Sequence, residues 1–309
     1  MTAPTPTTML VQMPGPAGTF EPQLTDRADF DVVAERSREL GRLLADRGVA
    51  FHRDSTLGVL LRDAERYAVD RAAGKSDMAM RQFVNAMHAY RLAQAILPTQ
   101  FDEDVEQCLR RIAGNDVNLS LRQQSMGKDH LWELELLVFL RRRGMKVRLQ
   151  DPPDLMLALG GADYPIACKK IYSEKGVQGQ MQKGARQLAK LGLGGVVAFN
   201  VDDLIAEDCI LNSRSRQEAG DILATLNAQF ILRHQGSIAT YVADGRCDGA
   251  LVSATSLVDV ETASPRFVNF TEVALWSPPE ATPAAQARIA ELSRMLSQPS
   301  TRVQALPFA

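Results

Sequence analysis

Cysteine and histidine are scarce in this 309-residue chain, which contains four of each. The cysteines, Cys108, Cys168, Cys209 and Cys247, are far apart and include no Cys-x-x-Cys pair, so their spacing does not indicate a structural zinc site. Their low density also argues against a disulfide framework and is typical of reduced thiols in the cytoplasm. The histidines show neither His-x-x-x-His nor His-Glu-x-x-His spacing. We therefore expect no histidine-based metal site.

Long apolar runs are also missing. No stretch approaches the roughly 18 apolar residues that span a bilayer, so we expect no membrane association. The first 20 residues carry no charged side chain and include four prolines. A secretory signal would need a basic start and an unbroken apolar stretch. We expect residues 1–28 to form a disordered tail and the protein to be cytoplasmic.

The overall composition is that of a globular protein, with 45% hydrophobic and 23% charged residues. The length suggests roughly two domains. A net charge of −2 excludes a binder with a basic surface all over. The charge is uneven, however: residues 141–190 carry 11 basic and 4 acidic side chains, while both flanking segments are net negative. The near-neutral total therefore hides one basic segment.

The first part of the chain has a helical pattern. Between residues 29 and about 115, apolar residues recur at the spacing of amphipathic helices. Ser55 and Asp77 stand where N-caps are expected. We predict an all-α N-terminal domain over residues 29–125, a bundle of about four helices with no sign of chemistry.

The remaining residues, 126–309, are predicted to form a second domain of the α/β class. A helix with Asp129 as its N-cap is followed by short apolar runs typical of strands. The order of elements favours a mixed sheet flanked by helices. The expected helices are 129–143, 177–191, 217–234 and 283–296, and the expected strands are 145–149, 155–159, 164–171, 194–200, 249–254 and 267–276.

One hairpin within this domain carries the chemistry. Asp154 begins one strand, and Lys169 lies near the end of the next strand, across a short connection at residues 160–163. Adjacent strands of this kind bring a carboxylate and an ammonium to the same end of a sheet. Strand alternation places Ala167 and Lys169 on one face and Cys168 on the other. A lysine in an otherwise apolar strand needs a partner to offset its desolvation, and Asp154 is the candidate.

The motif Pro153-Asp154 followed by Ala167-Cys168-Lys169 resembles that of the PD-(D/E)XK, or restriction-endonuclease-like, nuclease superfamily. The resemblance covers about residues 129–200 and includes the order of elements. It implies a restriction-endonuclease-like fold, one or two divalent ions (Mg²⁺ or Mn²⁺), and a lysine that orients or activates water. The implied catalytic and metal-binding residues are Asp154, Lys169, Glu133 or alternatively Glu135 on the preceding helix, Gln187 on the following helix, and the carbonyl of Cys168.

The motif has one departure, at position 167. The family has Asp or Glu there, and this chain has Ala167. Family members are known to relocate this acid, and the candidates here are Glu133, Glu135, Asp163 and Glu174. Two carboxylates with substrate phosphate and water are the usual minimum for Mg²⁺, so Asp154 and Glu133 meet the requirement.

The helix after the motif is predicted to contact nucleic acid. Gln180, Lys183, Gly184 and Gln187 fall on one helical face, and glutamine in this helix also recurs in the family. A glycine in a polar stripe allows a phosphate backbone to come close. A solvated helix face is an equally good explanation. The expected substrate contacts are Lys170, Gln180, Lys183 and Arg186.

Three functions remain open at this point. The first is a metal-dependent endonuclease or exonuclease that acts on DNA, in restriction or in defence against foreign DNA. The second, prompted by Ala167, is a degenerate nuclease fold that binds nucleic acid or a protein partner without cleavage. The third is an interaction module whose N-terminal helices bind a partner. A homodimer is also an option, because many nucleases of this fold are dimers.

Overall fold

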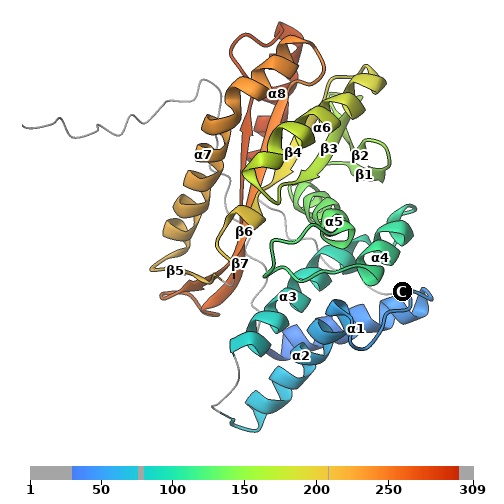
Figure 1. Ribbon diagram of the computed structural model, residues 1–309, viewed down its shortest axis with the longest axis vertical. Helices are drawn as coiled ribbons and strands as arrows, with labels where there is room; N and C mark the ends of the chain where they lie inside the picture. Colours follow the sequence, from blue (N-terminus) through green and yellow to red (C-terminus); the bar gives the residue numbers. More distant parts are fainter. Residues whose placement is uncertain (1–29, 76–79, 208, 299–309) are drawn as a thin grey trace, which may run out of the picture.

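The computed structural model describes residues 30–75, 80–207 and 209–298. It confirms the expected architecture, a helical bundle followed by a mixed sheet flanked by helices. Figure 1 shows the bundle at one end of the molecule and the sheet with helices α6, α7 and α8 at the other. The tail expected over residues 1–28 lies outside the described residues.

Four helices precede the helix that carries the candidate glutamates, as the apolar spacing predicted. The Ser55 side chain caps the second of them by accepting a hydrogen bond from the Gly58 N–H at 3.2 Å. The other expected cap, Asp77, lies outside the described residues. The helices are α1 (Phe30–Asp46), α2 (Thr56–Ala72), α3 (Met80–Ile96, continued by the 3-10 turn Leu97–Thr99) and α4 (Val105–Gly114).

Helix α5 (Met126–Arg142) connects the bundle to the sheet. It begins three residues earlier than predicted, because its N-cap is Ser125, which accepts from the Gly127 N–H at 3.1 Å. The prediction of Asp129 as the cap is wrong. Asp129 lies inside the first turn, where it accepts a hydrogen bond from the Tyr172 hydroxyl at 2.8 Å.

Within the described residues the sheet has seven strands in the order β1-β2-β3-β4-β6-β5, with β7 also paired to β6. Strands β1, β2 and β3 are antiparallel neighbours, β3, β4, β6 and β5 are parallel neighbours, and β7 is antiparallel to β6. The strands are β1 (Val147–Gln150), β2 (Asp154–Leu159), β3 (Ala162–Lys170), β4 (Val196–Asn200), β5 (Leu211–Ser213), β6 (Gly249–Val260) and β7 (Phe267–Trp276).

The C-terminal part differs from expectation mainly in the lengths of its elements. No strand was predicted at the short β5, and β6 extends to Val260, six residues beyond its predicted end. The helix expected over 217–234 is α7 (Arg216–Ala243), which runs on because no proline or glycine-rich break follows His234. Helices α6 (Val177–Leu191) and α8 (Pro283–Leu296) match their predictions closely.

Apolar side chains fill both faces of the sheet. On one face, α5 and α8 pack over β2 through residues such as Leu137, Leu157 and Leu292. On the other face, α6 and α7 cover β4 through Met181, Phe230 and other side chains. The first of these cores continues into the N-terminal bundle. The boundary predicted near residue 125 is therefore crossed by a continuous core.

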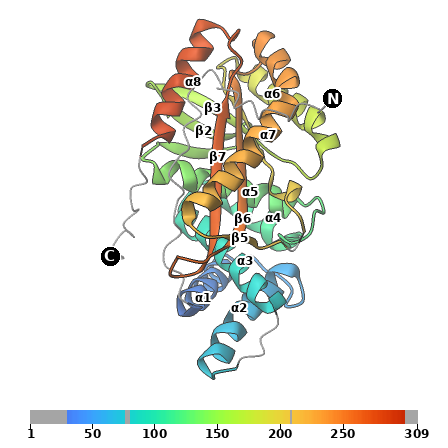
Figure 2. The same ribbon diagram turned by 90° about the vertical axis from the view of Figure 1, so that its left-hand side faces the viewer.

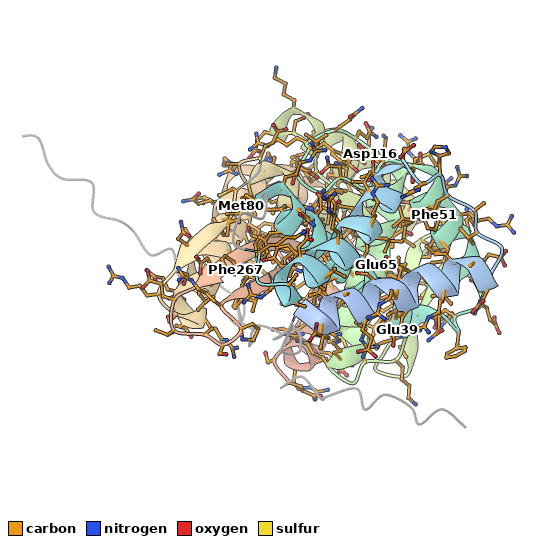
Figure 3. All side chains as sticks on the ribbon, turned by 90° about the horizontal axis from the view of Figure 1, so that it is seen from below. Glu39, Phe51, Glu65, Met80, Asp116 and Phe267 are labelled. Atoms are coloured by element: carbon orange, nitrogen blue, oxygen red, sulfur yellow. The ribbon has the colours of Figure 1, made fainter. Side chains whose placement is uncertain are left out.

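The hairpin of β6 and β7 reaches from the far end of the sheet to the bundle (Figure 2). Phe267 at its tip stacks edge-on against Phe83 of α3, with ring centroids 4.7 Å apart. Seen from below in Figure 3, Phe267 lies beside the bundle helices. The Asn269 side chain donates to the Met87 carbonyl at 3.2 Å. These contacts add a second junction between the bundle and the sheet.

None of the helices in the described ranges combines the length and apolar character needed to cross a bilayer.

The buried side chain of Glu272 on β7 makes the stability of the protein depend on pH. Glu272 is 3% exposed, and burial raises its pKa from 4.5 to about 8, against the lowering effect of Arg143. The folded state therefore holds a proton that the unfolded state has lost, and this group reduces stability as pH rises from about 4.5 to 8. We expect Glu272→Gln, a neutral replacement, to raise the free energy of unfolding by on the order of 1–3 kcal/mol at pH 9.

Urea unfolding of both proteins at pH 5 and pH 9 checks this result. At pH 5 the wild-type acid is protonated, so the variant should be nearly as stable as the wild type. Glu280→Gln, at an exposed position, is the control and should have no effect at either pH. An equal stability change for Glu272→Gln at both pH values would contradict the prediction.

Candidate functional site

The structure brings Asp154 and Lys169 together at the end of the β2–β3 hairpin. The Asp154 Oδ2 atom accepts from the Lys169 ammonium at 3.0 Å and from the backbone N–H of Cys168 at 2.6 Å. The Lys169 ammonium also donates to the Cys168 carbonyl at 2.6 Å. Both side chains are largely buried, Asp154 to 9% exposed and Lys169 to 13%. A carboxylate and an ammonium are thus fixed side by side, as the sequence predicted.

The backbone at Asp154 is unusual. Its φ is 122°, and among the described residues it is the only non-glycine residue with a positive φ. Such a conformation costs free energy and is found mainly where function needs a side chain in one place. Here the carboxylate accepts from the backbone N–H of Cys168, two residues beyond Ile166, where pairing with Leu155 ends.

Glu133 of α5 lies close enough to Asp154 to influence its ionisation. Burial raises the pKa of Asp154 from 3.8 to about 7, and the charge of Glu133 adds to the rise, whereas Lys169 lowers it. Carboxylate oxygens of this kind are the ligands that Mg²⁺ and Mn²⁺ prefer. A metal ion held by Asp154 and Glu133 stays a prediction.

Position 167 offers no carboxylate and no room for one. Ala167 is fully buried in the apolar core beneath α6 and α7, whereas Cys168 faces the core on the α5 side. This alternation is as predicted. The burial of Cys168 raises the pKa of its thiol well above the ordinary value. A metal contact through its carbonyl, which now accepts from Lys169, stays a prediction.

The other acids considered as replacements have partners elsewhere. Glu135 of α5 forms an ion pair with Arg91 at 2.5 Å, on a different side of the helix from Glu133. Asp163 pairs with the exposed Arg148 at 3.0 Å. Glu174 pairs with Arg233 at 2.6 Å and with His234 at 2.5 Å, both on α7. Of the candidate acids, Glu133 is the one that acts on the charge of Asp154.

Helix α6 presents part of its predicted polar face to solvent. Lys183 and Arg186 are exposed, and Gln180 and Gln187 are half-buried. The Gln187 Oε1 atom is buried and has no hydrogen-bond partner among the described residues. Gly184 faces β4 rather than a phosphate backbone, because a Cβ added there would lie 2.8 Å from the Val197 side chain. Its role is close helix–sheet packing.

Lys170 is placed differently from the other candidate substrate contacts. Its side chain is buried, and its ammonium bonds the Asn200 side chain at 2.6 Å and the Asp203 carboxylate at 2.8 Å. Asn200 is the last residue of β4, and Asp203 lies in the 3-10 turn that follows it. An ammonium held in this way is engaged by two partners within the protein, and a substrate contact through Lys170 stays a prediction.

The basic segment is partly neutralised within the protein. Arg141 forms two hydrogen bonds with Asp102, at 2.8 and 2.6 Å, and the buried Arg143 donates to the Leu296 carbonyl. Other cations of the segment are exposed, and three of them lie on α6. The exposed cations are Lys146, Arg148, Lys175, Lys183, Arg186 and Lys190. Helix α6 therefore carries half of the exposed cations of this segment.

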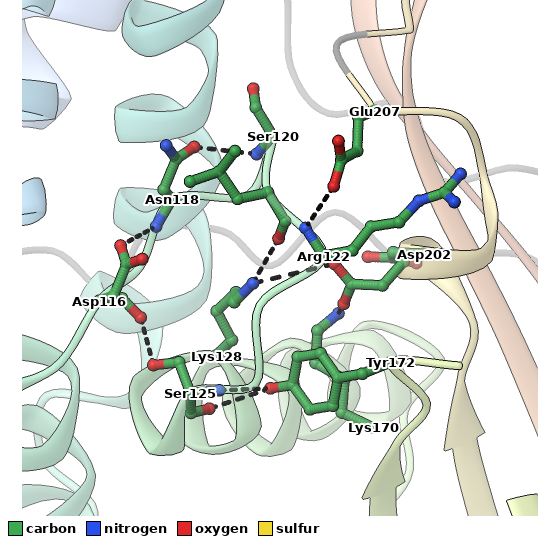
Figure 4. A network of polar contacts seen from close by, with 12 residues as sticks. Asp116, Asn118, Ser120, Arg122, Ser125, Lys128, Lys170, Tyr172, Asp202 and Glu207 are labelled. Carbon is green, nitrogen blue, oxygen red and sulfur yellow. Dashed lines mark hydrogen bonds and ion pairs between the residues drawn. The ribbon is translucent and has the colours of Figure 1, made fainter. Parts of the chain in front are cut away.

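A polar network where α5 meets the segments after β3 and β4 was not predicted from the sequence (Figure 4). Lys128 of α5 is fully buried, donates to the Leu121 carbonyl at 2.6 Å, and lies 3.8 Å from Asp203. The Tyr172 hydroxyl bonds the backbone of Ser125. A pocket beside this network is lined by charged residues of both parts of the chain, including Arg91, Arg122, Lys170, Asp202 and Glu207. Helical periodicity gives no signal for such a site, because its residues come from several elements.

Comparison of the chain with protein-family models, with curated proteins and with solved structures finds no match. The site is therefore defined by its own geometry. That geometry is a strained, buried carboxylate bound to a lysine, with a helix glutamate beside it and an exposed basic helix on the next segment of the chain.

Proposed function

We propose that the protein is a divalent-metal-dependent nuclease that cleaves DNA phosphodiester bonds with a site of the PD-(D/E)XK type. The observation that carries the proposal is the Asp154 carboxylate, held by Lys169 and the Cys168 N–H at the end of a hairpin, with Glu133 beside it. This is the arrangement that the resemblance implies. A role in restriction or in defence against foreign DNA is part of the same proposal.

Each group of the site has a task in this reaction. Asp154 and Glu133 would hold Mg²⁺ or Mn²⁺, and a bound ion would supply activated water and neutralise charge on the phosphate. The Lys169 ammonium lies where it stabilises developing negative charge. Lys183 and Arg186 on α6 supply exposed cations for neighbouring phosphates.

A second candidate function is favoured by Ala167. The acid that the family motif has at this position is replaced by a buried methyl group. With one carboxylate fewer, a nuclease fold that binds nucleic acid or a protein partner without cleavage is the alternative. Either function is compatible with protein contacts through the N-terminal helices and with a homodimer.

Cleavage and binding assays on the full chain separate the two functions. Linear, circular and single-stranded DNA are incubated with Mg²⁺ or Mn²⁺, and binding is followed as a function of salt. We expect metal-dependent cleavage, reduced about 10–100-fold in Lys169→Met, because the variant lacks the ammonium beside the site. Lys146→Met is the matched control, since Lys146 is exposed and precedes β1, and it should cleave like the wild type.

The outcomes decide between the candidates. Salt-dependent binding with no cleavage under either metal would support the degenerate binder and overturn the nuclease. Cleavage that persists unchanged in Lys169→Met would assign the activity to another site or to a contaminant.

A further inference from the structure

Three side chains with metal-binding atoms converge where α4 packs against α5. The Cys108 Sγ atom of α4 lies 3.8 Å from His130 Nδ1 and 4.0 Å from Glu133 Oε2. The latter two atoms are 2.8 Å apart, one turn apart on α5. All three atoms lie within 4.8 Å of one another. Most of this interface is apolar, so a thiol, an imidazole and a carboxylate directed at one point are out of character with it.

The distances suit a tetrahedral ion. Zn²⁺ bonds of about 2.3 Å to sulfur and about 2.0–2.1 Å to nitrogen and oxygen place tetrahedral ligand atoms roughly 3.3–3.6 Å apart. The observed separations differ from these values by about half an ångström, which side-chain rotation accommodates. The mixture of sulfur, nitrogen and oxygen ligands selects a transition ion such as Zn²⁺ rather than Mg²⁺.

The surroundings of the cluster are negatively charged. The carboxylates of Glu133, Asp151 and Asp104 act electrostatically on Cys108. A divalent cation would offset this excess of negative charge. The convergence of the three ligand atoms is the observation that carries the site.

We infer that Cys108, His130 and Glu133 form a binding site for a zinc-class transition ion, with a fourth position left for water. Three protein ligands and an open position are typical of reactive rather than purely structural zinc sites. The site shares the Glu133 carboxylate with the proposed nuclease site beside Asp154, but it rests on its own geometry and does not depend on the proposed nuclease function.

Spacing in the sequence hides this site. Cys108 and His130 are 22 residues apart and lie on two helices, so neither belongs to a short cysteine or histidine pattern. The expectation that no histidine-based metal site exists rested on such patterns. The fold supplies the proximity that the spacing lacks.

Titration of the purified full chain with Co²⁺ tests the inference, because cobalt bound to a thiolate gives a charge-transfer absorption in the near ultraviolet. We expect one equivalent to produce this band and Zn²⁺ to abolish it by competition. Cys108→Ser should lose the band. Its affinity for Zn²⁺ should fall by more than the roughly 10–100-fold that follows loss of an outer-sphere group. Cys209→Ser, at a partly exposed cysteine, is the control and should retain the band.

A second variant keeps the test decisive if Cys108→Ser does not fold. His130→Ala should bind Zn²⁺ more weakly and lose the rise in melting temperature that Zn²⁺ gives the wild type. A wild-type chain that gives no thiolate–cobalt band, or a Cys108→Ser variant that keeps it, overturns the site. Absence of DNA cleavage with an intact cobalt band would instead remove the nuclease and leave this site standing.

Discussion

Asp154→Asn is expected to reduce metal-dependent DNA cleavage by on the order of 10³-fold or more. The substitution removes the negative charge that holds the metal ion, while one amide oxygen can still accept from both the Cys168 N–H and the Lys169 ammonium. These two bonds go to a single oxygen atom in the wild type. The expected loss of activity therefore comes from the missing negative charge and the weaker binding of the metal ion, and not from unfolding of the hairpin. Initial rates of cleavage at saturating Mn²⁺ and Mg²⁺ measure the effect.

Stability distinguishes this result from unfolding. The pKa of Asp154 is raised to about 7, mainly by burial, so its ionisation reduces the stability of the metal-free protein as pH rises from about 4 to 7. At pH 8 the neutral asparagine should be at least as stable as the wild type in a metal-free thermal melt. Asp163→Asn, which removes an exposed acid from the same hairpin, should leave cleavage unchanged. An Asp154→Asn variant that folds and cleaves normally would end the nuclease proposal.

Sequence reasoning succeeded where chemistry depends on local pairing. A two-residue hairpin connection joins β2 to β3, so the positions of Asp154 and Lys169 follow from strand alternation and register. Helix α6 could be placed from its apolar spacing and from the glycine that ends it. The same alternation separates Lys170 from Lys169, and applying it would have shown that Lys170 belongs to the opposite face.

The remaining features depend on packing between distant elements. Glu133 and Glu135 are two residues apart, so they lie about 200° apart around α5, and only the helix orientation decides which faces Asp154. The partner of Glu135 is Arg91, 44 residues earlier. The pairing of Cys108 with His130 likewise requires the α4–α5 contact. No local pattern specifies these relationships.

The buried ion network around Arg91 joins the two parts of the chain. Arg91 of α3 bonds Glu135 of α5 at 2.5 and 2.8 Å, and Asp202 beyond β4 at 2.5 Å. Asp202 also accepts from the Thr255 N–H at 2.7 Å. Burial alone would raise the pKa of Asp202, but Arg91 and Lys170 outweigh it and keep that pKa below its ordinary value. Asp202 is therefore charged at neutral pH in the presence of the arginine.

Arg91→Met is expected to lower the free energy of unfolding by about 3–5 kcal/mol at pH 7, because it leaves two buried carboxylates without their counter-charge. Arg36→Met, which breaks an exposed pair with Glu39, should cost less than about 1 kcal/mol. Urea unfolding of both variants measures the difference. Adding Glu135→Leu to Arg91→Met should recover part of the loss, since it removes one unpaired charge. Equal costs for the two arginine variants would show that the Arg91 network contributes no more than a surface pair.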